Sequence, residues 1–301
     1  MRSMTSLLIG GTSQVGIDLY GVLQSYGMEI VSPSRAALDI SHPGQLRALL
    51  EAHKVDVAIN CAAYTAVDAA ESDVQAAWSL NAVWPAVLAV ETRARSIPVV
   101  HVSTDYVFDG RKPTPYIESD PVNPINVYGA SKLGGEYGIR ANPKHAILRT
   151  SWVVSPHRSN FVKTMLRLAA ERPSLRVVAD QVGAPTIAFD LARTIGKVAW
   201  TLASHSSAPS GTWHVSNAGY CSWADLAIAA MEGARVRGLA SVPVEQISAS
   251  DYKTAASRPA NSCLAIDQLE QDWKIRPRHW RIALEEVLDA VKVSGLKPLS
   301  Q

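Results

Sequence analysis

The first half of the chain contains four short runs of mostly apolar residues. They occupy residues 6–10, 55–61, 98–104 and 145–151. The runs are rich in Val and Ile and are continuous instead of alternating, which is typical of strands covered on both faces. Between them, apolar positions recur at helical spacing from Val15 to Tyr26, and again across residues 71–95. Strand and helix in repeated alternation predict an α/β fold with a Rossmann-type, doubly wound parallel sheet.

After residue 151 the alternation becomes less regular. Helical patterns are found at residues 160–171, 186–203, 222–234 and 279–291, and short strand patterns at residues 175–180 and 211–217. We therefore expect a nucleotide-binding domain at residues 4–150, to which segments near residues 170–203 return. Residues 151–291 are expected to form mainly a smaller, discontinuous α/β lobe for the substrate. The last residues, 292–301, are expected to fray.

Composition and charge exclude several classes of protein. The chain has 301 residues, 47% of them hydrophobic, and a net charge of only +2, so it is expected to be globular and not to bind nucleic acid. Eighteen consecutive apolar residues occur nowhere, and the N-terminal apolar run is too short for a signal peptide. Three widely spaced cysteines lack the spacing of a zinc site. We expect a cytoplasmic protein that does not cross a membrane and keeps reduced thiols.

A glycine-rich turn, "IGGTSQVG" at residues 9–16, follows the first predicted strand and opens a helix. Glycines at such a turn let a dinucleotide pyrophosphate lie against free amides at the helix N-terminus. The candidate cofactor-binding residues here are Gly10, Ser13, Gln14, Val15 and Gly16. Ser13 occupies a position where glycine is common, so a positive φ there would cost free energy. A hydrogen bond from its hydroxyl to a phosphate would offset that cost.

The residues after the second predicted strand bear on the choice of cofactor. No carboxylate follows that strand directly, whereas Arg35 does. An arginine at this point suits the 2'-phosphate of NADPH, so we predict NADPH as the cofactor, with NADH as the alternative. The other interpretation of Arg35 is a solvated surface charge that contacts no cofactor. Asp39 and Ile40 lie further on, where they can flank the adenine.

Tyr128 and Lys132 are spaced to lie on one face of a helix, within "NVYGASKLGGEYG" at residues 126–138. Ser103 and Thr104 end the strand predicted at residues 98–104, on the ligand-binding edge of such a sheet. A phenol is a weak acid at neutral pH, and a nearby ammonium lowers its pKa so that it can protonate an alkoxide. The alternative is a core tyrosine with Lys132 paired to Glu136. We also expect the helix glycines to pack under a cofactor.

These motifs resemble the extended short-chain dehydrogenase/reductase family, and within it the reductases of nucleotide-linked sugars. The resemblance covers residues 4–291. It includes "INCAAYTAVDAAES" (59–72), "HVSTDYVFDG" (101–110), "LRTSWV" (148–153), "DQVGAPT" (180–186) and "ASRPANSCLAIDQL" (256–269). It implies NADPH-dependent reduction of the 4-keto group of a dTDP-linked 4-keto-6-deoxysugar. The alternatives are another nucleotide-4-keto-6-deoxysugar, or a non-catalytic NADP-binding subunit resembling the β subunit of methionine adenosyltransferase.

The resemblance also implies roles for individual residues. Thr104, Tyr128 and Lys132 would form the catalytic triad, with Tyr128 as the proton donor. The residues implied near the cofactor are Ala63, Tyr64, Thr65, Ser103, Tyr128 and Lys132. Those implied around the nucleotide sugar are Thr65, Val67, Thr104, Asp105, Tyr106, Trp152 and Arg258. Trp152 would offer an apolar ring to the deoxysugar, and Arg258 a cation to the diphosphate.

A metal ion and a dimer are further possibilities by analogy with the family. Some relatives hold Mg²⁺ with acidic side chains at a dimer contact, and Asp18 and Asp190 fall at candidate positions here. The third position falls at Ala290, beside Asp289, so the acidic set is incomplete. The sequence therefore predicts no metal site, and it leaves a monomer and a homodimer open.

Overall fold

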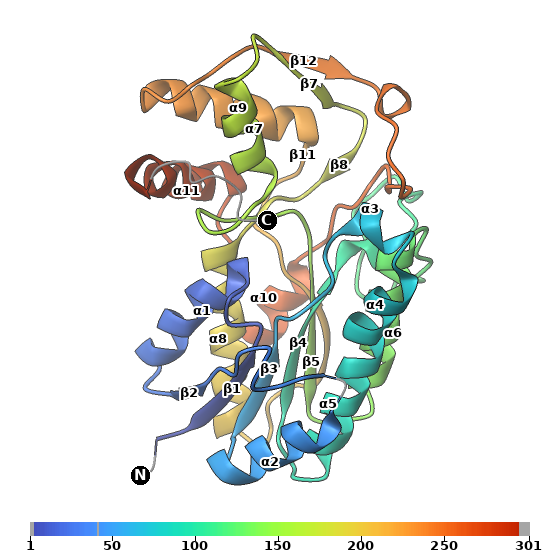
Figure 1. The fold of residues 1–301 in the computed structure, drawn as a ribbon, viewed down its shortest axis with the longest axis vertical. Helices are drawn as coiled ribbons and strands as arrows, with labels where there is room; N and C mark the ends of the chain where they lie inside the picture. The colour runs from blue at the N-terminus through green and yellow to red at the C-terminus, as the bar shows by residue number, and fades with distance from the viewer. Residues whose placement is uncertain (1–2, 41, 295–301) are drawn as a thin grey trace.

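The computed structural model describes residues 3–40 and 42–294, and its centre is a six-stranded parallel sheet (Figure 1). In spatial order the strands are β10 (Gly211–His214), β5 (His145–Thr150), β4 (Val99–Thr104), β3 (Val57–Asn60), β1 (Thr5–Ile9) and β2 (Glu29–Val31). Every neighbouring pair in this sheet is parallel. The Rossmann-type sheet predicted from the apolar runs is therefore confirmed.

The order of the strands fixes where a ligand can bind. β1 pairs with β2 on one side and with β3 on the other, so the chain reverses its direction of winding at β1. In open α/β sheets, ligands bind outside the carboxyl ends of the strands at such a switch point. The glycine-rich turn follows β1 directly and therefore lies at this edge.

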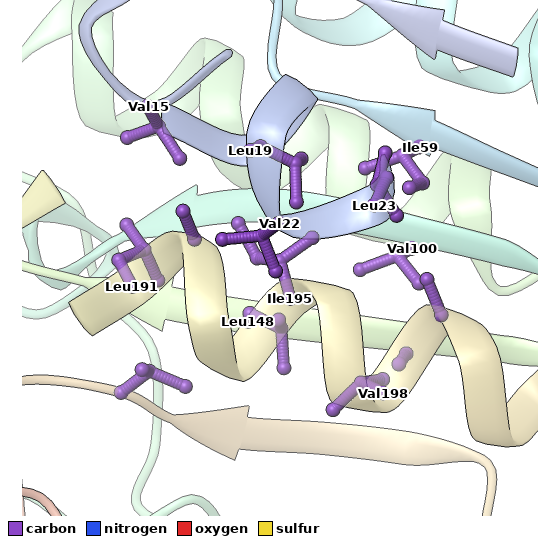
Figure 2. Packing of buried hydrophobic residues seen from close by; sticks show 14 of the residues in the cluster. Val15, Leu19, Val22, Leu23, Ile59, Val100, Leu148, Leu191, Ile195 and Val198 are labelled. Carbon is purple, nitrogen blue, oxygen red and sulfur yellow. The ribbon is translucent and has the colours of Figure 1, made fainter. Parts of the chain in front are cut away.

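Two helices cover one face of the sheet, α1 (Gln14–Ser25) and α8 (Ala188–Ser204). Leu19 and Leu23 of α1 meet Leu191 and Ile195 of α8 above the sheet, in one fully buried apolar cluster (Figure 2). α8 thus returns from the second half of the chain to complete the first. β10 does the same, and so does α10 (Asp267–Trp273), which packs beside it.

The other face is covered by a second group of helices. These are α2 (Pro43–His53), α3 (Val67–Ala70), α4 (Val74–Trp78), the π-helical turn η1 (Ser79–Val83), α5 (Trp84–Arg93) and α6 (Val127–Ile139). Leu46, Trp84, Leu88 and Ile139 are buried with the sheet residues beneath them. The short 3₁₀ turn η2 (Asp105–Val107) follows β4.

A smaller lobe lies beyond the carboxyl edge of the sheet, at the top of Figure 1. Its helices are α7 (Phe161–Ala169), α9 (Trp223–Val236) and α11 (Trp280–Ser294). Its strands pair two by two: β7 (Leu175–Val178) with β12 (Val244–Ile247), β8 (Val182–Gly183) with β11 (Cys221–Ser222), and β6 (Val153–Val154) with β9 (Thr186–Ile187). The turn η3 (Ala249–Asp251) follows β12. The three helices share an apolar cluster of their own.

Several details differ from the sequence-based expectation. The helix expected over residues 71–95 is interrupted by η1, where the side chain of Asn81 bonds to other segments. The apolar patterns did not predict α2, α10 or the two-residue strands. A strand of two residues carries too little periodicity to be recognised. The tail expected at residues 292–301 begins inside α11, which continues to Ser294; residues 295–301 lie outside the described residues.

No helix within residues 3–40 and 42–294 combines the length and the apolar character needed to cross a lipid bilayer.

Candidate active site

The glycine-rich turn is closed by its own backbone. The Ser13 N–H donates to the carbonyl of Gly10 over 2.9 Å. Gly10 has a φ of +82°, and a Cβ there would lie 2.7 Å from the Ala62 nitrogen at the end of β3. Gly16 faces the turn, where a Cβ would lie 2.2 Å from the Gly10 oxygen. Both glycines are therefore required for β1, β3 and α1 to meet.

Ser13 is the N-cap of α1 and is not strained. Its φ is −71°, so the cost of a positive φ does not arise. Its hydroxyl accepts a hydrogen bond from the Gly16 N–H over 3.0 Å. The amides of Gln14 and Val15, at the first two helical positions, have no carbonyl of the helix to bind. The first turn of α1 contains no acidic residue, so these amides can receive an anion.

The residues expected to hold the adenosine half lie beyond β2. Arg35 is exposed, and its side chain has no hydrogen-bond partner among the described residues. The Asp39 carboxylate lies 3.1 Å from His42 Nδ1, and Ile40 packs partly buried against the sheet. The structure thus leaves the Arg35 guanidinium free to meet a phosphate but does not hold it in one position.

A buried amide fixes the segment after β3, which contains Ala63, Tyr64 and Thr65. Asn81, 1% exposed, accepts from the Tyr64 N–H over 2.8 Å and donates to the Tyr64 carbonyl over 3.1 Å. The same amide donates to the Ser131 hydroxyl of α6 over 3.0 Å. The sequence analysis missed Asn81, which links the expected cofactor segment to the helix of Tyr128 and Lys132.

Ser103 does not point toward the expected cofactor. It is 3% exposed, and its hydroxyl donates to Glu136 Oε1 over 2.6 Å. Glu136 also accepts two hydrogen bonds from Arg149, each 2.8 Å long, and this ion pair is almost completely buried. The Ser103 hydroxyl thus belongs to a charged network below the site, and a contact between Ser103 and the cofactor stays a prediction. Glu136 is not the partner of Lys132.

Thr104 and Asp105 are buried side by side at the end of β4. Thr104 Oγ1 donates to Asp105 Oδ1 over 3.0 Å and accepts from the Tyr106 N–H over 3.2 Å. The other carboxylate oxygen, Oδ2, is buried and makes no close hydrogen bond within residues 3–40 and 42–294. Burial raises the pKa of Asp105 to about 7, although hydrogen bonds from Ser262 and Thr104 oppose the shift.

Helix α6 brings Tyr128 and Lys132 to the same edge. Asn126 caps its N-terminus by accepting from the Gly129 N–H over 2.7 Å. Tyr128 is partly buried, lies close to the Thr104 side chain, and packs edge-on against Tyr106 at 5.8 Å between ring centroids. Lys132 is 2% exposed and donates from Nζ to the carbonyl of Val102 over 2.6 Å.

The pKa values of this pair differ from the simple expectation. Burial lowers the pKa of Lys132 to about 8, although Glu136 and Cys61 oppose the shift. Burial raises the pKa of Tyr128 to about 12, and the nearby Thr104 hydroxyl only partly opposes it. The expected lowering of the phenol's pKa by Lys132 is thus absent. Desolvation of the phenolate is the largest cause, and the nearby Asp105 carboxylate raises the pKa further.

The glycines of α6 pack against protein. A Cβ on Gly135 would lie 2.1 Å from the Asn81 carbonyl oxygen, and one on Gly129 would lie 2.1 Å from that of Tyr106. The prediction that the glycines lie under a cofactor is wrong. They let α6 approach η1 and η2 closely, which brings Tyr128 and Lys132 up to the ends of β3 and β4.

Trp152 follows β5 and adopts a φ of +44°, which is rare for a bulky residue. Its indole stacks on Trp223 of α9, with ring centroids 3.5 Å apart and planes within 10°. A Cβ on Gly183 would lie 2.5 Å from its Cε2 atom. Much of the ring therefore faces protein.

Arg258 is paired with a carboxylate. Its guanidinium donates to both carboxylate oxygens of Asp68, over 2.6 and 3.2 Å. The pair joins the segment after η3 to α3, which begins at Val67. The proposed contact of Arg258 with a diphosphate would have to share the guanidinium with Asp68.

The acidic residues considered for a metal are all engaged elsewhere. Asp18 lies 3.2 Å from His157 Nε2, Asp190 accepts from Arg278 over 2.8 Å, and Asp289 accepts from Arg237 over 2.7 Å. Within residues 3–40 and 42–294, no three His, Cys, Asp or Glu side chains gather as a metal site requires.

Comparison with known proteins places this geometry in a family. Residues 4–293 match the family model described as the RmlD substrate binding domain. A dTDP-4-dehydrorhamnose reductase of Sinorhizobium fredii is 42% identical over 270 residues, which cover 89% of this chain and 91% of that protein.

Solved structures agree. A dTDP-4-dehydrorhamnose reductase of Clostridium acetobutylicum is 36% identical, with a TM-score of 0.89 over 96% of this chain and all of that one. The enzyme of Bacillus anthracis, solved in complex with NADP, is 34% identical, with a TM-score of 0.88 over 98% of this chain and all of that one. The chain therefore belongs to the RmlD family, that of the dTDP-4-dehydrorhamnose reductases, which are NADPH-dependent oxidoreductases.

Proposed function

We propose that the chain reduces the 4-keto group of dTDP-4-dehydro-L-rhamnose to give dTDP-L-rhamnose, with NADPH as the reductant. The observation that carries the proposal is that α6 brings Tyr128 beside the Thr104 side chain and Lys132 onto the Val102 carbonyl, both at the carboxyl end of β4. The glycine-rich turn lies on the same edge, at the switch point of the sheet. The names of the relatives support dTDP-4-dehydrorhamnose as the substrate, and the NADP complex of one supports the cofactor.

Bound NADPH would supply a hydride to C4 of the sugar, which turns the ketone into an alkoxide. Tyr128 would donate its phenolic proton to that alkoxide, and Thr104 would hydrogen-bond the reacting oxygen. Lys132, held by the Val102 carbonyl, would keep a positive charge near the developing phenolate and reach the nicotinamide ribose. A phenol with a pKa of about 12 donates poorly, so we infer that Tyr128 acts only once the alkoxide, a stronger base, has formed.

A direct assay tests this proposal. Purified protein is mixed with NADPH and the dTDP-4-keto-sugar, and the loss of nicotinamide absorbance is followed. The Tyr128→Phe variant should lose most of kcat, by about 10²-fold or more, and retain its affinity for NADPH. Turnover at the wild-type rate in this variant would reject Tyr128 as the proton donor.

Two further arms of the same assay address the cofactor and the substrate. Arg35→Ala should raise KM for NADPH more than KM for NADH, because only NADPH carries a 2'-phosphate. Turnover with a different nucleotide-4-keto-6-deoxysugar and not with the dTDP-rhamnose precursor would move the assignment to that sugar. Binding of NADPH without turnover of any sugar tested would favour a regulatory role.

A further inference from the structure

The segment of residues 155–160 leaves the smaller lobe after β6 and contacts the glycine-rich turn. Asn160 Nδ2 donates to the Gln14 side chain over 3.0 Å, and His157 Nε2 lies 3.2 Å from Asp18 Oδ1. Arg158 Nε donates to the Thr12 carbonyl over 2.9 Å. Three side chains of this one segment thus hold one lobe against the candidate dinucleotide site of the other.

Arg158 occupies a backbone conformation that favours glycine. Its φ is +54°, a region in which any side chain beyond glycine is disfavoured. Such positions persist where the surroundings require them, and they concentrate at ligand contacts. Residue 158 is therefore an arginine at a position where the backbone conformation favours glycine.

The rest of the Arg158 guanidinium is available. The side chain is exposed, and Nε is its only atom with a hydrogen-bond partner among the described residues. Both Nη groups therefore remain beside the turn.

The glycine-rich turn is suited to an anion that the Arg158 guanidinium could also bind. The amides of Gln14 and Val15 are open, and no carboxylate in the first turn of α1 competes for them. The nearest acidic residue along the helix, Asp18, is engaged by His157. An anion lying on these amides would meet no negative charge from the first turn and would have the Arg158 guanidinium next to it.

We propose that Arg158 binds the pyrophosphate of the dinucleotide together with the amides of α1. Arginine suits this contact because its planar fork can donate two parallel hydrogen bonds to phosphate oxygens. The inference rests on the proposed function in one respect, that NADPH binds at the glycine-rich turn. It adds a contact from the substrate lobe, so that cofactor binding would also fix the position of that lobe.

Two variants of Arg158 and one control test the inference. Arg158→Gln removes the charge, and Arg158→Gly removes the side chain while relieving the unfavourable φ. Lys54→Gly is the matched control, because Lys54 is also cationic with a positive φ of 45° but ends α2 at the far end of the sheet (Figure 1). Dissociation constants are measured for NADPH by nicotinamide fluorescence, and for adenosine 2'-monophosphate by displacement of NADPH.

Both Arg158 variants should bind NADPH about tenfold more weakly, which corresponds to about 1.4 kcal/mol. Adenosine 2'-monophosphate lacks the pyrophosphate, so its affinity should stay within about twofold of wild type. Lys54→Gly should match wild type for both ligands. Arg158→Gly should melt at the wild-type temperature, since the lost bond to Thr12 is offset by the relieved backbone.

Two results would overturn the inference. The first is unchanged NADPH affinity in Arg158→Gly. The second is an equal loss for both ligands, which would mean that residues 155–160 act only by shaping the turn. Neither measurement uses a sugar substrate, so the absence of sugar reduction would count against the proposed function and leave this test intact. Failure of the wild-type protein to bind NADPH would refute both.

Discussion

The two halves of the candidate site lie at the same edge of the sheet, but one is formed by backbone groups and the other by buried polar side chains. At the end of β1 the site consists of backbone: a glycine at φ +82°, a capped helix and open amides. At the end of β4 it consists of buried polar side chains, with Lys132, Asp105, Glu136 and Arg149 all at most 3% exposed. The first half is suited to a charge that every dinucleotide carries. The second places ionisable groups where water does not reach them, which shifts the pKa values of Lys132 and Asp105.

The largest expected effect is at the buried ion pair below the β4 half. Glu136→Gln keeps the shape of the side chain but leaves Arg149 without a counter-charge, which should cost about 3–5 kcal/mol of folding free energy. For a protein of this size the melting temperature should fall by about 5–8 °C. The same substitution at Glu171, in an exposed pair with Arg167, is the control and should cost less than about 0.5 kcal/mol. Equal losses in calorimetry would show that burial does not matter here.

A second prediction uses the pKa of Asp105, which is raised to about 7 from its ordinary value. The folded state then holds this proton more tightly than the unfolded state, so stability is full below about pH 4 and declines as the pH rises through 7. Asp105→Asn should therefore melt at least about 2 °C above wild type at pH 8 and close to it at pH 4. The titratable groups facing this carboxyl are Tyr106, Tyr128 and Cys263. A difference in melting temperature that stays constant with pH would contradict the assignment.

The smallest effect is expected in the backbone half. Ser13→Ala removes the N-cap of α1 and should cost about 1 kcal/mol, or less than about 2 °C in melting temperature. Because the hydroxyl is used by Gly16, the affinity for NADPH should change by no more than about twofold. A tenfold loss of affinity in the binding assay would instead mean that the hydroxyl binds a phosphate, which is the alternative raised by the sequence.

The same contrast explains which residues sequence reasoning found and which it missed. Gly10, Gly16, Tyr128 and Lys132 belong to local patterns whose spacing carries their meaning. Asn81 and the Glu136–Arg149 pair carry no local signal, because their partners lie 13 to 50 residues away along the chain. Ser103 was assigned to the cofactor because it ends a strand, yet alternate residues of a strand face opposite sides of the sheet. Its neighbour Thr104 therefore meets Tyr128, and Ser103 meets Glu136.

The sequence by itself determined the Rossmann-type sheet, the position of the glycine-rich turn and the pairing of Tyr128 with Lys132 on one helix. Each of these depends on residues close together in the chain, where spacing and residue type are enough. The tertiary structure alone decided the electrostatics, including the raised pKa of Tyr128, the pairing of Arg258 with Asp68 and the approach of Arg158 to the turn. These depend on burial and on contacts between distant segments, and both exist only once the chain has folded.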